Sequence, residues 1–160
     1  MSKLIIGIDI GAKGGIAALY NNELTYAPLG DTKSWIDWIK SFKTKPELVV
    51  IEDLHSIFGA SAKSNFQFGV NNGIVIGALE TMTYKYEKVA PKTWQKAIWK
   101  QEDRVSKGIK VDTKATSLNA AKRLYPKETF LISSRSSVPH DGVVDAVLLA
   151  TYGYDCCLRH

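Results

Sequence analysis

Four acidic residues have a chemical type and a placement that could support catalysis: Asp9, Glu52, Asp141 and Asp145. Asp9 interrupts the apolar run 4–10, and an isolated carboxylate in a buried strand is costly unless a cation or a set of hydrogen bonds stabilises it. Glu52 ends a second apolar run, so it is expected at the end of another strand. Asp141 and Asp145 are four residues apart, which on a helix places both on one face, where they repel each other. A cation is therefore expected beside these acids.

The donor set predicts hard divalent cations, Mg²⁺ or Mn²⁺. All candidate ligands are carboxylates, and no His or Cys cluster accompanies them. Enzymes that cleave a phosphodiester by in-line attack commonly use two such ions, about 3.5 to 4 Å apart. Each acid also has a structural alternative: Asp9 as a turn acceptor, Glu52 as a surface acid at a strand end, and Asp141 as a helix N-cap or first-turn acid.

Strand and turn signals predict the elements that position these acids. The two-residue loop Asn21-Asn22 suits a tight hairpin, so the chain is expected to open with three antiparallel strands. Strands are expected over 4–10, 14–20, 23–28 and 48–51, near 88–90 and near 129–132. Helices are expected after the N-capping residues 31–34, over 63–86, from Pro91, over 113–124 and from 139–141, with loops around Gly108 and over 133–138. This order predicts a single α/β domain over residues 1–160.

The positive charge of the chain is concentrated in one segment. The formal net charge is +5, and residues 85–114 hold nine Lys or Arg against four acids. Together with Trp94 and Trp99, this segment is typical of a footprint for a nucleic-acid backbone. The alternative is a solvated helix face whose lysines provide solubility.

Composition indicates a soluble globular protein, with 45% hydrophobic and 23% charged residues among 160. No apolar run reaches the roughly 18 to 20 residues of a membrane span, and the first residues do not resemble a signal peptide. The only cysteines, Cys156 and Cys157, are adjacent and are expected to be reduced thiols in the cytoplasm, with pairing to another chain as the alternative.

Five short segments carry a resemblance to a known family: Gly7-Ile8-Asp9 with its glycine-rich hairpin, then residues 50–52, 66–69, 89–94 and 140–146. In this order they are similar to the RuvC-type Holliday junction resolvases, in particular their phage-encoded branch, and they span nearly the whole chain. The resemblance implies a ribonuclease H-like fold with a mixed five-stranded sheet and helices on both faces. It also implies a homodimeric endonuclease, with two Mg²⁺ ions (or Mn²⁺) per active site, that resolves four-way or branched DNA by paired symmetric nicks. No nucleotide cofactor is expected.

The resemblance assigns catalytic and metal-binding roles to Asp9, Glu52, Asp141 and Asp145. Many family members keep the last two acids three residues apart, whereas here that position is Gly142, which leaves His140 as a second candidate for the fourth ligand. Lys114 stands where the family has a basic residue that assists the scissile phosphate; surface solubility is its alternative.

DNA contacts are expected from aromatic and basic residues. Phe66 and Phe68 lie on a predicted helix facing the junction, where an exposed ring stacks on unpaired bases. Two residues apart, they cannot share a helix face, so at least one belongs to the core or to a dimer interface. The phosphates are assigned to Lys92, Lys96, Lys107 and Lys110.

Other functions fit parts of the same pattern. The Asp-Ile-Gly opening also occurs in actin-like ATPases and sugar kinases, which need two such domains around a nucleotide. A ribonuclease H-like nuclease acting on other branched DNA or on RNA shares the acids, since the acids do not determine the substrate. A DNA-binding module without catalysis would not need four acids.

Overall fold

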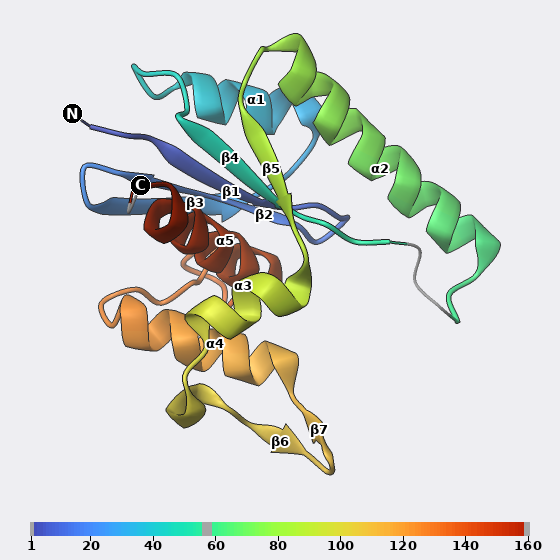
Figure 1. The fold of residues 1–160 in the computed structure, drawn as a ribbon, viewed down its shortest axis with the longest axis vertical. Coiled ribbons are helices and arrows are strands. Elements are labelled where there is room, and N and C mark those ends of the chain that lie inside the picture. Colours follow the sequence, from blue (N-terminus) through green and yellow to red (C-terminus); the bar gives the residue numbers. More distant parts are fainter. Residues whose placement is uncertain (1, 56–58, 159–160) are drawn as a thin grey trace.

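The computed structural model describes residues 2–55 and 59–158, and its centre is a mixed five-stranded sheet (Figure 1). The strands are β1 (Ile5–Asp9), β2 (Gly15–Tyr20), β3 (Glu23–Pro28), β4 (Leu48–Glu52) and β5 (Tyr86–Val89). Their order across the sheet is β3-β2-β1-β4-β5. β1, β2 and β3 pair in antiparallel fashion, whereas β1–β4 and β4–β5 are parallel. The three antiparallel opening strands and the mixed sheet expected from the sequence are therefore confirmed.

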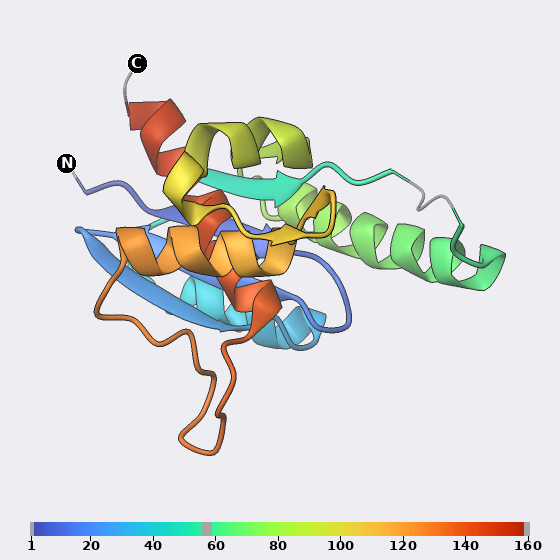
Figure 2. The same ribbon diagram turned by 90° about the horizontal axis from the view of Figure 1, so that it is seen from below.

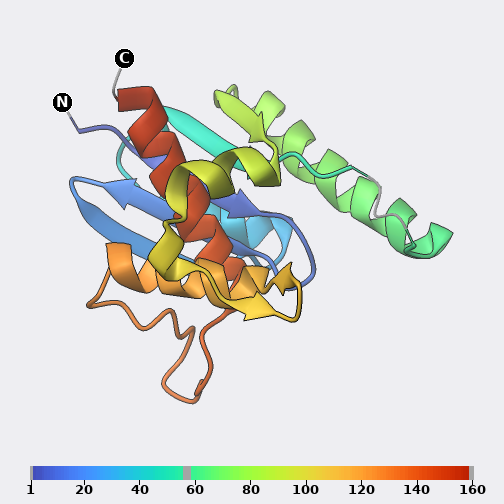
Figure 3. The same cartoon turned by 60° about the horizontal axis from the view of Figure 1, so that its bottom comes forward.

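Helices cover both faces of this sheet (Figures 1 and 2). They are α1 (Thr32–Lys40), α2 (Ala62–Thr81), α3 (Pro91–Ile98), α4 (Thr113–Leu124) and α5 (Asp141–Leu158), with a short 3₁₀ helix η1 (Gln101–Asp103). A separate hairpin consists of β6 (Ser106–Lys107) and β7 (Lys110–Val111). α1 and α2 pack on one face, and α3, α4 and α5 on the other. The first half of α2 extends beyond the edge of the sheet (Figure 3). No helix among the described residues is long and apolar enough to cross a membrane.

Alternating side chains of β1 supply both cores. Ile5 packs with α5 on one face, and Ile6 and Ile8 pack with α1 and α2 on the other. α5 crosses β1 and β2 so closely that a Cβ atom at Gly7 would lie 2.1 Å from the backbone oxygen of Ala146. This contact requires glycine, and it fixes the first half of α5 against the strand that ends in Asp9 (Figure 3).

Two boundaries and one strand differ from the sequence-based expectation. The helix expected over 63–86 ends at Thr81, because Thr83 takes a left-handed conformation (φ 55°) and the amide of Tyr84 donates to the carbonyl of Leu79 in a Schellman closure. β5 consequently begins at residue 86 rather than 88.

The strand expected near 129–132 is wrong. Phe130 has a φ of 58°, which no strand residue adopts, and its ring is fully buried. Its amide donates to the Tyr26 hydroxyl at 3.2 Å instead of to a neighbouring strand, so the apolar run anchors a loop and does not extend the sheet. The loop expected around Gly108 is the β6–β7 hairpin.

Candidate active site

Asp9 and Glu52 leave the sheet at the same edge. Asp9 is the last residue of β1 and Glu52 the last of β4, and these parallel strands pair in register, with Ile8 opposite Ile51. The carboxyl ends of neighbouring parallel strands meet at one edge, so the two side chains emerge side by side. The expectation that two strands present these acids together agrees with this geometry.

The first turn of α5 brings the other acids to this edge. Gly142 forms a bridge with Gly14, in the loop between β1 and β2, and a Cβ atom at Gly15 would lie 2.4 Å from the backbone oxygen of Gly142. This backbone contact holds the start of α5 beside the end of β1. Asp145, one turn further, is therefore close enough to Asp9 for their charges to interact.

Burial and mutual repulsion dominate the electrostatics of the site. The pKa of Asp9 rises to about 8, first because the carboxyl is buried and then because of the charges of Asp145, Glu52 and Asp141. The pKa of Asp145 rises to about 7, chiefly through burial, then through Glu52 and Asp141. Burial also raises the pKa of Glu52. A cluster in which acids hold protons near neutral pH is one that a bound cation would stabilise.

Two buried side chains orient these acids, and the sequence pattern identified neither role. Trp94, fully buried in α3, donates from Nε1 to Glu52 Oε1 at 2.8 Å. Ser117, buried in α4, hydrogen-bonds to Asp145 and opposes the rise of its pKa. For Ser117 the sequence does contain one signal: it lies three residues after Lys114, on the same helix face as that predicted site residue.

The predicted role of Trp94 and Trp99 in a DNA footprint is corrected. Trp94 is 1% exposed, and Trp99 is half-buried with its ring packed edge-on against Trp94 at a centroid distance of 6.1 Å. Trp94 belongs to the core beneath α3, and Trp99 packs against that core. Trp94 therefore cannot stack on bases, although it contacts the site through Glu52.

The start of α5 separates the roles of His140 and Asp141. The amide of Val143 donates to His140 Nδ1 at 3.1 Å, so His140 is the N-terminal cap and its Nδ1 lone pair is engaged. Asp141, the first residue of the helix, is exposed and pairs with Lys114 Nζ at 2.9 Å. Of the two alternatives for Asp141, the N-cap is therefore wrong and the first-turn acid is confirmed. The Asp141 carboxylate lies at the rim of the site with a lysine beside it.

The donor set fits hard cations, although the acids do not by themselves form a compact metal-binding cluster. Among the residues the structure describes, no three His, Cys, Asp or Glu side chains are close enough to form a ready-made metal site. The four acids offer only oxygen ligands, the chemistry that Mg²⁺ and Mn²⁺ prefer.

The residues predicted to contact DNA lie on three elements. Phe66 on α2 is 74% exposed, while Phe68 is half-buried, so only Phe66 presents a free ring. The predicted phosphate-binding lysines are all largely solvent-accessible: Lys92 and Lys96 on α3, Lys107 and Lys110 on the hairpin. Cys156 is exposed, and the side chain of Cys157 lies outside the described residues.

Comparison with solved structures identifies the fold. The chain is similar to RuvC of Thermus thermophilus in complex with a Holliday junction substrate, with a TM-score of 0.56, 15% identity, and 97% of this chain and 96% of that chain covered. A second structure of Thermus thermophilus RuvC matches with a TM-score of 0.55 and 17% identity over 96% of each chain. Neither a protein-family model nor a curated protein matches the sequence. The chain therefore has the ribonuclease H-like fold of RuvC, as the resemblance implied.

Proposed function

We propose that this protein is a divalent-metal-dependent endonuclease that resolves four-way DNA junctions. The observation that carries the proposal is the convergence of Asp9, Glu52 and Asp145 at one sheet edge, with two pKa values raised towards neutrality, in a chain with the RuvC fold. The phage-encoded branch and the cytoplasmic location stay predictions from the sequence.

Asp9, Glu52, Asp145 and Asp141 would hold the metal ions. When bound, two such ions supply an activated water and stabilise the leaving oxygen of the phosphodiester. The residues of the chain fix the geometry: Trp94 holds one oxygen of Glu52, and the Ser117 hydroxyl holds Asp145. Such supporting hydrogen bonds are commonly worth about 10- to 100-fold in metal affinity or activity.

Lys114 has a role at the rim of this site. Its ammonium contacts Asp141 and is itself exposed, so it can turn to a phosphate oxygen of a bound strand. We propose that Lys114 exchanges the Asp141 carboxylate for the scissile phosphate when DNA binds. This exchange would free Asp141 for the metal and neutralise charge on the phosphate in one step.

Paired symmetric nicks require two active sites, and we propose a homodimer. The support is α2, on which Val70 and Ile74 are exposed four residues apart on one face, in a stretch without charged residues from 64 to 79. Light scattering at micromolar concentration tests this proposal, with a dimer expected for the wild type and a monomer for Val70→Lys. A wild-type monomer that nonetheless nicks junctions in pairs would contradict it.

A cleavage assay on four substrates tests the proposed function. A four-way junction, a duplex, a flap and an RNA–DNA hybrid are compared with Mg²⁺ and with EDTA. We expect paired nicks in the junction alone, only with Mg²⁺, and their loss in Asp9→Asn and Glu52→Gln with junction binding retained. Preferred cleavage of the flap or the hybrid would show that the protein is a nuclease for another substrate. More than a few per cent of wild-type activity in both variants would refute the assignment of Asp9 and Glu52 as metal ligands.

A further inference from the structure

The β6–β7 hairpin carries an apolar side chain that its turn does not require. Lys107 and Lys110 pair, which leaves Gly108 and Ile109 as a two-residue turn, and Gly108 has a φ of 67°. Glycine with positive φ at the first central position is the type II′ arrangement, whose second position commonly takes Asn, Asp or Ser. Ile109 is instead fully exposed at the tip. The fold gives no reason for an isoleucine there.

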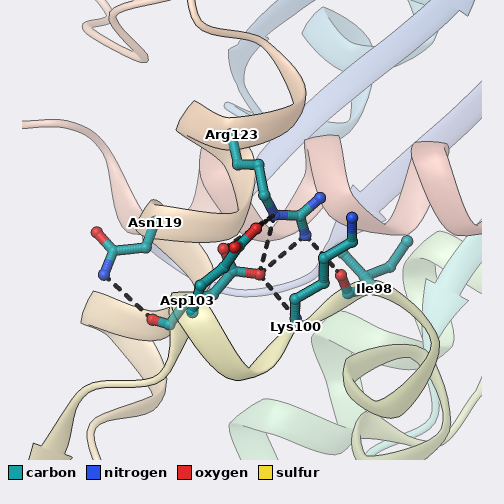
Figure 4. Close-up of polar contacts among 6 residues, drawn as sticks. Ile98, Lys100, Asp103, Asn119 and Arg123 are labelled. Atoms are coloured by element: carbon teal, nitrogen blue, oxygen red, sulfur yellow. Dashed lines mark hydrogen bonds and ion pairs between the residues drawn. The ribbon is translucent and has the colours of Figure 1, made fainter.

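A buried ion pair holds the base of this hairpin (Figure 4). Asp103, 2% exposed in η1, accepts from Arg123 Nη2 at 2.8 Å and Nε at 3.0 Å, and from the amide of Lys100 at 2.8 Å. Asn119 Nδ2 donates to the backbone oxygen of Asp103 at 3.1 Å. The chain entering the hairpin is thereby fixed to α4, because Arg123 and Asn119 both belong to that helix.

The chain leaving the hairpin is fixed to the other end of α4. The amide of Asp112 donates to the carbonyl of Val105 at 2.8 Å, and the amide of Val105 donates to Thr116 Oγ1 at 3.0 Å. The Asp112 carboxylate accepts from the amide of Ala115 and caps the helix. The hairpin is therefore rigid at its base while its tip projects from the body of the molecule (Figure 1).

Charge and distance place this tip beside the proposed active site. Three exposed cations, Arg104, Lys107 and Lys110, lie on and beside the hairpin, and Lys114, paired with Asp141, follows it on α4. Within residues 104–114 the single acid, Asp112, is engaged as the cap. Lys114 lies five positions after Ile109, so their Cα atoms are at most about 18 Å apart. At about 3.4 Å per base pair, this span corresponds to about five base pairs of bound DNA.

We propose that the hairpin enters bound DNA and that Ile109 acts as an apolar wedge at a base step near the crossover. Lys107 and Lys110 bind the phosphates on either side, and the ion pair and hydrogen bonds of Asp103 hold the hairpin in place when its tip inserts. Apolar wedges, isoleucine among them, unstack and kink a step in this way. Charge complementarity favours DNA as the occupant over a protein partner. This inference rests on the proposed function and deepens it.

Fluorescence of 2-aminopurine tests the wedge. The probe is placed in turn at the first five base pairs on each side of the crossover of a four-way junction, and binding is followed in EDTA to prevent metal-dependent cleavage. The wild type is expected to raise the fluorescence at one position by unstacking it. Ile109→Ser should lose this rise at saturating protein and bind about tenfold more weakly, because a buried isoleucine contributes on this scale.

Matched variants separate the tip from its surroundings. Leu124→Ser removes a partly exposed apolar side chain at the opposite end of α4 and should behave as the wild type. Lys107→Ala with Lys110→Ala should weaken binding while keeping the fluorescence rise at saturation. Thermal unfolding should show equal Tm for Ile109→Ser and the wild type, since Ile109 is fully exposed.

The outcomes distinguish the wedge from the proposed function. If the wild type cleaves junctions with Mg²⁺ but Ile109→Ser matches it in affinity and fluorescence, the wedge alone is refuted. If Ile109→Ser changes the oligomeric mass in light scattering while fluorescence is unchanged, the tip contacts protein and the proposal is overturned. If the wild type neither binds nor cleaves branched DNA, the proposed function fails and the wedge fails with it.

Discussion

Proton binding by Asp9 makes the stability of the metal-free protein depend on pH in an unusual direction. In the unfolded chain an aspartate titrates near 3.8, whereas in the folded protein the pKa of Asp9 is about 8. Between these values the folded state holds a proton that the unfolded state has released. The free energy of unfolding must therefore decrease as pH rises: the contribution is complete below about pH 4 and is lost by about pH 8.

The expected magnitude follows from the size of this shift. Each unit of pKa difference corresponds to about 1.4 kcal/mol. Asp145, with a pKa of about 7, titrates in the same range, and its repulsion of Asp9 is contained in the raised pKa of Asp9. We expect the pair to lose roughly 6 kcal/mol between pH 5 and pH 8, about 4 kcal/mol of it through Asp9. Asp31 and Asp103, whose pKa values are lowered, lose their own stabilising contribution only below about pH 4, outside this window.

Urea unfolding in EDTA at pH 5, 6, 7 and 8 measures this dependence. Asp9→Asn imitates the protonated acid and should be more stable than the wild type at pH 8. The contribution of Asp9 to the slope should be lost, and the smaller contribution of Asp145 below about pH 7 should remain. Asp37→Asn, an exposed residue on α1, is the control and should keep the wild-type slope. Mg²⁺ at pH 8 should stabilise the wild type and have little effect on Asp9→Asn. A wild-type stability that is constant or rises from pH 5 to pH 8 would refute the reasoning, as would an unchanged slope in Asp9→Asn.

Three further predictions concern the surroundings of the acids. Trp94→Phe keeps a buried aromatic ring but removes the hydrogen bond to Glu52, so cleavage by the folded protein should fall about 10- to 100-fold. The smaller ring leaves a cavity and should also lower Tm, so cleavage is compared well below the Tm of the variant. Equal cleavage rates would show that the hydrogen bond has no role. Asp141→Asn should lower the rate of Mg²⁺-dependent cleavage by at least about tenfold, with partial rescue by Mn²⁺. His140→Ala removes the helix cap, so its main effect should be a loss of about 1 kcal/mol in the free energy of unfolding. Near-normal cleavage in Asp141→Asn with an inactive His140→Ala would reverse that assignment. The third change replaces three solvent-accessible lysines by alanine: Lys96, Lys107 and Lys110. The slope of log affinity for DNA against log salt concentration should become less steep by roughly 0.9 for each phosphate contact that is lost. An unchanged slope would mean that these lysines only solubilise the protein.

The sheet and the placement of the acids could be predicted because local signals and tertiary structure agree there. Asn21 and Asn22 both have positive φ, as a tight hairpin between the second and third strands requires. A carboxylate at the end of an apolar strand lies at the edge of the sheet, and both Asp9 and Glu52 have this position. The location of the candidate site therefore follows from strand pattern and residue type.

The features that escaped prediction depend on contacts between distant residues. Phe130 lies in an apolar run that resembles a strand, but its backbone is left-handed and its ring packs against Tyr26, a contact that no local signal indicates. Trp94 lies among lysines, and its inward orientation depends on Glu52, 42 residues away in the sequence. Thr83 ends α2 in a conformation that glycine usually provides, so no residue signal marked the end of that helix.

The close approach of α5 to the loop between β1 and β2 accounts for the unusual position of the fourth acid. RuvC-type sequences commonly have an acid three residues before the last one, and that position is Gly142 here. A Cβ atom at residue 142 would lie 2.2 Å from the backbone oxygen of Lys13, which leaves no room for a side chain. An acid there would push α5 off the sheet and draw Asp145 away from Asp9. Asp141 shares the helix face of Asp145 and is exposed, so a carboxylate at this position can serve as the proposed fourth ligand without disturbing the contact between α5 and the loop.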